Sequence, residues 1–169
     1  GVWLMREMIL AGVPGHYVFH YGEERGGIGS GNVVKFQPDR FAGIVFAIAF
    51  DRRGTIDVIT HQAGGRCCSE AFAQSLADQL QAVATYIPCD MGFYTDTAEY
   101  TNIVAECTNI SVGYTGEHTA NEAVDARHVL KLRDTMVGFD ESTLVQVRKP
   151  GEVDDDWDDM HYRWRQWNA

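Results

Sequence analysis

The stretch Phe41–Phe50 (FAGIVFAIAF) constrains the fold more than any other part of the chain. It is a continuous apolar run that is rich in strand formers, and it is shorter than the roughly 18 residues that a membrane-spanning segment needs. A run of this kind is typical of a strand that is buried on both faces. We therefore expect a sheet with other elements packed on both of its sides.

Helix-like and strand-like segments alternate along the chain, which is typical of an α/β domain. Apolar residues recur at helical spacing in three segments: Val2–Ala11, Ser69–Thr85 and Asp125–Gly138. Strand character is found in three further segments: His16–Tyr21, Thr55–Thr60 and Asn109–Tyr114. Residues 32–40 are predicted to form a short helix or turn, which Pro38 closes. The expected fold is α/β, with a central mostly parallel or mixed sheet flanked by helices.

The composition excludes several classes of partner. The chain has 169 residues and a formal net charge of −10. A nucleic-acid-binding surface must neutralise phosphates and an anionic membrane surface repels acidic proteins, so this charge argues against both partners. The sequence contains no signal-peptide pattern. Its four cysteines form no CxxC pair, and we interpret them as buried thiols in a reducing compartment, which predicts a cytoplasmic protein.

The composition changes after about Asp140, which divides the chain into a domain over residues 1–140 and a tail over residues 141–169. The tail contains the acidic run EVDDDWDD, and its last stretch, HYRWRQWNA, places Trp164 and Trp167 among arginines. Two interpretations stay open. The tail is either a flexible acidic segment or a docking segment whose tryptophans pack on the domain or on a partner.

Polar side chains follow three of the predicted strands. Glu23 and Glu24 follow the first strand within a glycine-rich stretch, Asp51 directly follows the apolar run, and His118 comes shortly after the last strand. Taken alone, the glutamate pair is also compatible with a charged, solvated turn. If the strands are parallel neighbours, however, these side chains converge at one edge of the sheet, where ligands bind in open α/β folds. Carboxylate and imidazole groups are ligands that zinc accepts, so the pattern predicts a metal site.

Three stretches carry a resemblance to a known family. The segment GEERGGIGS, the apolar strand that leads into Asp51, and the segment NISVGYTGEHTANE resemble the zinc aminopeptidase-type family of co-catalytic metallopeptidases, which has carboxypeptidase-like and deacylase-like relatives. The likeness covers residues 1 to about 138 and none of the tail. It implies a zinc-exopeptidase-like fold, and hydrolysis of a peptide or small amide substrate by a metal-activated water.

The resemblance also implies a role for each matched position. Glu23 resembles the general base, and Glu24 and His118 resemble two ligands of one zinc ion. Asp51 resembles a ligand of a second zinc ion. Three further residues are candidates for contacts with substrate, although packing roles are the alternative for each of them: Tyr114, His61 and Asp96.

The sequence departs from the family pattern at its start. The pattern includes a further histidine ligand and a bridging aspartate upstream of the opening helix, whereas this chain begins at Gly1. The expected domain is therefore incomplete at the N-terminus, and a missing N-terminal segment or chain is an expected partner. Without it, we expect weak metal binding and poor hydrolysis.

Three hypotheses follow. The chain is part of a di-zinc exopeptidase, or a truncated non-catalytic relative that serves as a binding or structural module, or a small α/β interaction protein that uses its tail for contact. The choice among aminopeptidase, carboxypeptidase and deacylase stays open.

Overall fold

The computed structural model describes residues 1–153 of the chain, and the predicted docking role of Trp164 and Trp167 lies outside this range. The fold is mixed α/β, built on a four-stranded sheet with strand order β1-β6-β2-β5. The bounds of these strands are Phe46–Arg52 (β1), Asp57–Ile59 (β2), Ile87–Cys89 (β5) and Glu106–Ser111 (β6). β1 runs parallel to β6 and β2 parallel to β5, while β2 and β6 are antiparallel. The expectation of a mixed sheet is confirmed.

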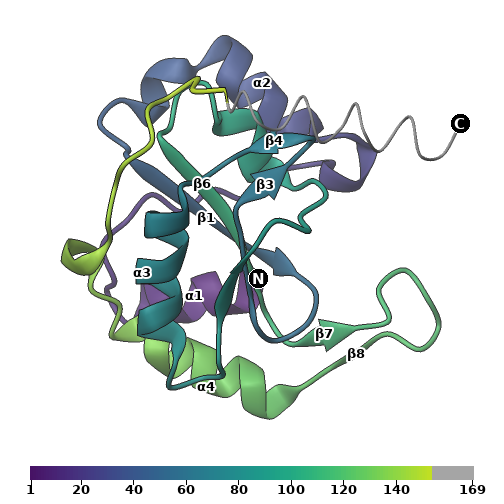
Figure 1. The fold of residues 1–169 in the computed structure, drawn as a ribbon. Helices are drawn as coiled ribbons and strands as arrows, with labels where there is room; N and C mark the ends of the chain where they lie inside the picture. Colours follow the sequence, from purple (N-terminus) through teal and green to yellow (C-terminus); the bar gives the residue numbers. More distant parts are fainter. Residues whose placement is uncertain (154–169) are drawn as a thin grey trace, which may run out of the picture.

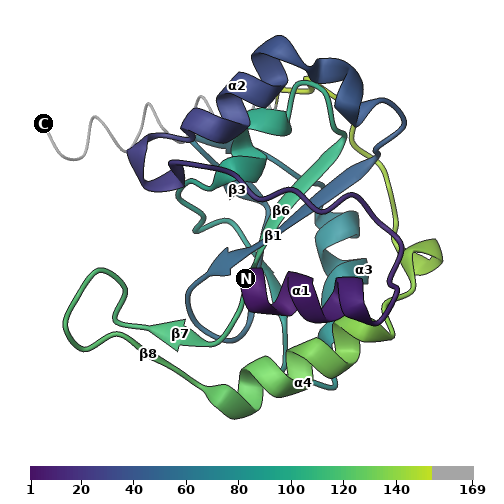
Figure 2. The same cartoon turned by 180° about the vertical axis from the view of Figure 1, so that it is seen from behind.

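Helices lie on both sides of this sheet. Their bounds are Val2–Leu10 (α1), Ile28–Phe36 (α2), Glu70–Leu80 (α3) and Ala126–Val137 (α4). Figure 1 shows α3 in front of the sheet, and the reverse view in Figure 2 brings α1 to the front, with α4 below the sheet in both views. None of the helices in the described part of the chain has the length and apolarity to cross a bilayer.

Short elements complete the described chain. Four are 3-10 helices: Glu23–Arg25 (η1), Pro38–Phe41 (η2), Asp96–Tyr100 (η3) and Glu141–Thr143 (η4). Four are short strands that pair as two antiparallel ladders: His61–Gln62 (β3) with Gly65–Arg66 (β4), and Tyr114–Thr115 (β7) with Ala123–Val124 (β8).

Side-chain caps explain where α3 and α4 begin. Ser69 Oγ accepts a hydrogen bond from the backbone N–H of Phe72 (3.1 Å), and Asp125 Oδ1 accepts two from the first turn of α4 (2.9 and 3.2 Å). Such bonds satisfy donors that the first turn of a helix leaves without partners. The three helices predicted from apolar spacing are confirmed, although α3 ends before the predicted Thr85.

The larger core cluster joins α1, α3 and α4 to the sheet. Its fully buried members include Phe72, Leu76, Leu80, Val58, Ile110 and Leu132. Complete burial of such a side chain stabilises the fold by about 1.5–3 kcal/mol. A second, smaller cluster contains Phe41, Ile59, Cys67, Tyr100, Val104 and Cys107. Three of the four cysteines are buried free thiols, as the sequence predicts, and Cys89 is half-buried.

The segment His16–Tyr21 is not a strand, so this prediction is wrong. It runs between α1 and η1 without a ladder to any described strand, and its residues Phe19 and Tyr21 are exposed. Alternating apolar residues favour a strand only where a neighbour supplies main-chain hydrogen bonds. Two of its members make inward contacts: the Tyr17 hydroxyl donates to the carbonyl of Val13 (2.9 Å), and His20 Nε2 is hydrogen-bonded to the hydroxyl of the buried Tyr100.

The apolar run is also corrected in two respects. The strand begins at Phe46 rather than Phe41, because η2 and the left-handed Gly43 (φ 79°) occupy the first part of the run. It is half-buried at the edge of the sheet, not buried on both faces. Asp51 is the second-last residue of β1, so it belongs to the strand and does not follow it.

Residues 144–152 return over the domain and are tied to it by Glu106. This carboxylate, which has no exposed surface, accepts hydrogen bonds from the N–H groups of Val147 and Arg148 (both 2.9 Å). It also accepts from the N–H (2.7 Å) and hydroxyl (2.9 Å) of Ser69 at the start of α3. The first part of the sequence-defined tail is therefore packed against the domain.

Candidate functional site

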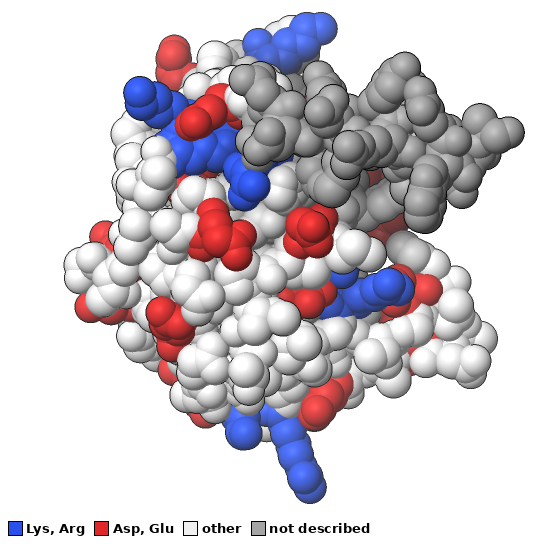
Figure 3. Space-filling model, in the orientation of Figure 1, with Lys and Arg blue, Asp and Glu red and all other residues white. Residues whose placement is uncertain are grey.

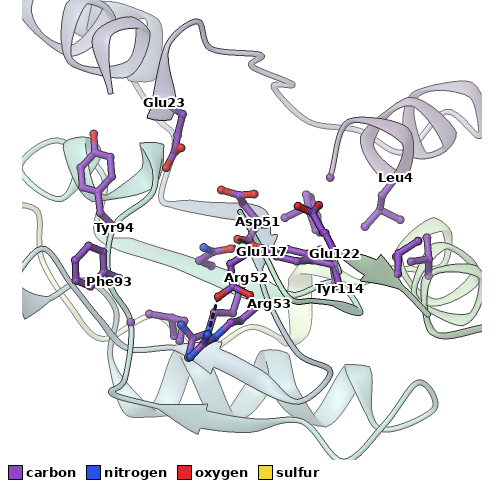
Figure 4. A pocket seen from close by; sticks show the side chains of 18 of the residues that line it. Leu4, Glu23, Asp51, Arg52, Arg53, Phe93, Tyr94, Tyr114, Glu117 and Glu122 are labelled. Atoms are coloured by element: carbon purple, nitrogen blue, oxygen red, sulfur yellow. Dashed lines mark hydrogen bonds and ion pairs between the residues drawn. The ribbon is translucent and has the colours of Figure 1, made fainter. Parts of the chain in front are cut away.

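A cavity of about 1320 Å³ opens beside the carboxyl ends of the parallel strands β1 and β6. Its polar lining includes Glu23, Glu24, Asp51, Tyr114, Glu117, His118 and Glu122. Its apolar lining includes Trp3, Leu4, Ile59, Met91, Phe93, Val129 and Leu130. In the close view of Figure 4, Asp51 lies between Glu23 on one side and Tyr114 on the other. The four residues predicted to bind metal or move a proton therefore share one cavity.

Glu23 and Glu24 reach the cavity from the η1 turn and not from a strand end. Left-handed glycines flank this turn, with φ of 71° at Gly22, 84° at Gly26 and 64° at Gly27. These backbone angles are readily adopted by glycine and strained in other residues. The glycine-rich sequence thus lets the chain leave the extended conformation and turn both glutamates toward one space.

Tyr94 packs directly against the chain that follows the η1 turn. A Cβ atom added at Gly27 would lie 1.7 Å from the Tyr94 hydroxyl oxygen, so the two segments are in close contact. The hydroxyl donates to Glu99 Oε1 (3.0 Å). The position of the glutamate pair therefore depends on a tyrosine that lies far away in the sequence.

Asp51 is fixed through both its main chain and its side chain. Its N–H donates to Asn109 Oδ1 (2.9 Å) on the neighbouring strand, and its carbonyl accepts from the Tyr114 hydroxyl (3.0 Å). Thr95 Oγ1 donates to Asp51 Oδ2 (3.3 Å). Burial raises the pKa of Asp51, and this hydrogen bond acts in the opposite direction.

His118 lies on the loop between β7 and β8, which projects from the domain (Figure 1). Its Nε2 is 3.9 Å from Glu24 Oε2. Next to it, Glu117 pairs with Arg53 (2.6 Å), the contact drawn as a dashed line in Figure 4. His118 has φ of 59°, a conformation that is uncommon for residues other than glycine. The structure thus brings the predicted ligands Glu24 and His118 together from separate segments.

Burial and the repulsion among neighbouring carboxylates together favour the protonated form of the acidic groups in the site, and burial is the larger cause. Burial, followed by the charges of Asp51, Glu24 and Asp96, raises the pKa of Glu23 to about 7, while His118 acts in the opposite direction. Acidic side chains are also scattered over the outer face in Figure 3. Negative charge alone therefore does not distinguish the site, whereas the presence of Glu23, Glu24, Asp51 and His118 in one cavity does.

Titration should report the combined effect of burial and repulsion on the pKa of Glu23. We expect the Glu23 carboxyl of the isolated chain to titrate near pH 7, because the folded state favours its protonated form. Its ordinary pKa is 4.5, so its contribution to stability is lost as the pH rises from about 4.5 to 7. NMR titration of the carboxyl carbon measures the midpoint. In Asp51→Asn the midpoint should fall, and an unchanged midpoint would contradict the proposed coupling.

The three candidate substrate contacts have different positions. Tyr114 lines the cavity, but its hydroxyl is engaged with the main chain of Asp51. His61 is buried with Nδ1 2.9 Å from Thr60 Oγ1, and it is not among the described residues that line the cavity. Asp96 does not line it either, although its charge acts on Glu23. Its Oδ1 is buried and has no hydrogen-bond partner among the described residues.

The sequence interpretation missed Tyr94, Asn109, Thr95 and Gln62. Each supports the site through a contact between segments that are distant in sequence. The local sequence around a residue does not specify such contacts. For Tyr94 and Thr95 the usable indication was their place in the connection between β5 and η3, since such connections frequently carry functional side chains.

The donor chemistry around Glu24 fits a divalent metal ion only in part. A carboxylate and an imidazole face each other, and the unbalanced carboxylates nearby would be neutralised by a cation. Within residues 1–153, however, no group of three or more histidine, cysteine, aspartate or glutamate side chains is arranged to hold a metal. A catalytic zinc normally has three protein ligands, so at least one further ligand is needed.

Comparisons of this chain with protein-family models, with curated proteins and with solved structures give no match.

Proposed function

We propose that this chain forms part of a zinc-dependent exopeptidase of aminopeptidase type, which hydrolyses peptide or small amide bonds. The observation that carries the proposal is the meeting of Glu23, Glu24, Asp51 and His118, from three separate segments, on the wall of one cavity. The same four residues carry the family resemblance in the sequence. Glu24 and His118 are both exposed at the rim of this cavity, so the support comes from the four residues lining one cavity rather than from the burial of this pair.

In this proposal Glu24 and His118 hold one zinc ion, and Asp51 contributes to the binding of a second. Zinc bound there would supply Lewis-acid chemistry that lowers the pKa of water and polarises an amide carbonyl. The domain supplies the orientation of these groups. Asn109 and Tyr114 fix the main chain of Asp51, and Arg53 restrains the loop of His118 through Glu117.

Glu23 acts as the general base that accepts a proton from the attacking water, and it later returns this proton to the leaving amine. The pKa of Glu23, raised to about 7 in the metal-free chain, would fall with zinc bound to the neighbouring carboxylates, so the role rests on the position of Glu23. Its half-buried position on the η1 turn faces the same cavity as the ligand pair.

The charges of the cavity favour substrates with a free amino terminus. The two arginines among the described lining residues are already paired, Arg52 with Asp57 (2.9 Å) and Arg53 with Glu117 (2.6 Å). The remaining acidic side chains attract an ammonium group and repel a carboxylate. An aminopeptidase is therefore a better proposal than a carboxypeptidase.

Further ligands would come from a segment attached ahead of Gly1 or docked beside it. Gly1 lines the cavity, and its amino group is close enough to Asp51 for that carboxylate to oppose the lowering of its pKa by burial. A residue joined to Gly1 would therefore lie at the cavity. This is where the resemblance expects the additional histidine and the bridging aspartate.

A non-catalytic binding module is the second candidate. It is favoured by the shortage of metal-binding groups in residues 1–153, since two facing donors bind zinc less firmly than three.

Metal analysis separates these candidates. We expect the chain to bind zinc weakly, with an increase in thermal stability on zinc addition that is lost in Glu24→Gln and in His118→Ala. Attaching a segment that provides histidine and aspartate should strengthen binding and produce release of amino acids from short peptides. Zinc binding that is unchanged in both variants would overturn the assigned ligands. Firm binding without hydrolysis in the extended chain would favour the binding module.

A further inference from the structure

Gln62 has a buried side-chain amide whose nitrogen is hydrogen-bonded and whose oxygen is not. Its side chain is 5% exposed, and Nε2 donates to Thr97 Oγ1 (3.2 Å) and to Cys67 Sγ (3.3 Å). The Thr97 hydroxyl itself donates to the carbonyl of Thr108 (3.2 Å), so it accepts from Gln62, which fixes the amide nitrogen on that side. The carbonyl oxygen Oε1 is buried and has no hydrogen-bond partner among the described residues.

An acceptor of this kind indicates a ligand contact when it lies at a cavity. Buried polar atoms are nearly always hydrogen-bonded, and an unpaired one lowers stability. Gln62 is one of the lining residues of the cavity described above, and its amide nitrogen is already bonded to core partners. The unpaired oxygen has almost no exposed surface, so a ligand in the cavity reaches it only after neighbouring side chains shift, and that ligand must supply an N–H or O–H donor.

The surroundings of Gln62 are apolar. Ile59, Met91 and Phe93 line the same cavity, and Met91 and Phe93 are 73% and 89% exposed. The N–H of Ala63 donates to the carbonyl of Phe93 (2.7 Å), which holds the Phe93 segment beside Gln62. Large apolar side chains with this much exposure are well suited to cover the stem of a bound side chain.

We infer that this part of the cavity is a specificity subsite for a side chain with an apolar stem and an N–H donor at its tip, which donates to Gln62 Oε1. The identification of that side chain as part of a substrate rests on the proposed function, whereas the binding preference itself does not. Side chains of lysine and glutamine have this chemistry. Norleucine and methionine provide stems of similar length without the donor.

Matched amino acid amides test the inference without requiring catalysis. Chemical-shift titration of the chain measures the dissociation constants of lysinamide against norleucinamide, and of glutaminamide against methioninamide. We expect the donor-bearing member of each pair to bind at least about fivefold more tightly, the contribution of one hydrogen bond. Glutaminamide and methioninamide form the neutral pair, since both of their side chains are uncharged. This pair separates the hydrogen bond from the general attraction of the lysine side-chain ammonium group to the acidic cavity.

Two variants identify the residue. Gln62→Met should reduce the preference within the neutral pair to parity, whereas Phe93→Ala should weaken both members of each pair by a similar factor and leave the preference intact. Thr97→Val removes the hydrogen bond from Gln62 Nε2 to Thr97 but keeps the side-chain carbonyl oxygen of Gln62. This variant should retain the preference.

Equal binding of both members of the neutral pair by the wild-type chain would overturn the subsite, even if Gln62→Met does not fold. A preference that persists in folded Gln62→Met would exclude Gln62. Failure of zinc binding or hydrolysis would overturn the proposed function and leave this binding result unaffected.

Discussion

Replacement of Glu106 by alanine is expected to destabilise the domain by about 3–5 kcal/mol, because several buried donors lose their acceptor and each unsatisfied donor costs about 1–3 kcal/mol. The fully buried carboxylate accepts four hydrogen bonds, two from Ser69 and two from the main chain at Val147 and Arg148. Removing it leaves these donors without partners and opens a cavity. Urea unfolding followed by circular dichroism measures the loss.

The same network joins two distant parts of the chain, the start of α3 and the segment 144–152. We therefore expect Glu106→Ala to make this segment sensitive to limited proteolysis under native conditions. Glu141→Ala is the matched control, because Glu141 is exposed in the same returning region and should change stability by less than about 0.5 kcal/mol. A loss below about 1 kcal/mol for Glu106→Ala would show that the network contributes little.

Substitution of Glu23 by glutamine is expected to lower the rate of peptide hydrolysis by about 10²–10⁴-fold in a zinc-loaded, extended form of the chain. Glutamine keeps the size of the side chain but cannot accept the proton. Zinc binding should be nearly unchanged, because the assigned ligands are Glu24, Asp51 and His118. The acidic limb of the pH–rate profile should also disappear if it reports the ionisation of Glu23.

Glu141→Gln serves as the control for this experiment, since it makes the same chemical change outside the cavity. It should leave the rate within about twofold of the original. A Glu23→Gln variant with full activity would exclude Glu23 as the base. A variant that has lost its zinc as well as its activity would instead assign Glu23 to metal binding.

The sequence predicts three of the four described α-helices and three of the four strands of the main sheet, β1, β2 and β6, although with less exact bounds for the strands. α1, α3 and α4 follow from apolar spacing, and Ser69 and Asp125 mark two of the starts by capping. A strand requires a partner that local sequence does not specify. The alternation in His16–Tyr21 therefore gave a wrong prediction, and the apolar run from Phe41 became a shorter edge strand.

The position of Asp51 at the cavity could be predicted, because it lies in the last residues of β1, which runs parallel to β6. His118 reaches the same cavity from the loop of the β7–β8 hairpin, which the sequence did not predict. The glutamate pair reaches the same place by a different route, through the left-handed glycines of the η1 turn. Tyr94 and Gln62 could not be predicted. Their roles depend on which loop faces which turn, and that arrangement is determined only by the complete three-dimensional packing.

The backbone of His118 also has a consequence for engineering. A backbone φ of 59° is more strained for histidine than for glycine. The substitution His118→Gly would therefore relieve local strain, although it removes the proposed ligand. Selection for thermal stability alone would then favour the loss of this side chain. Libraries screened only for heat resistance should lose the imidazole at this loop, and keeping it requires a screen that also demands function.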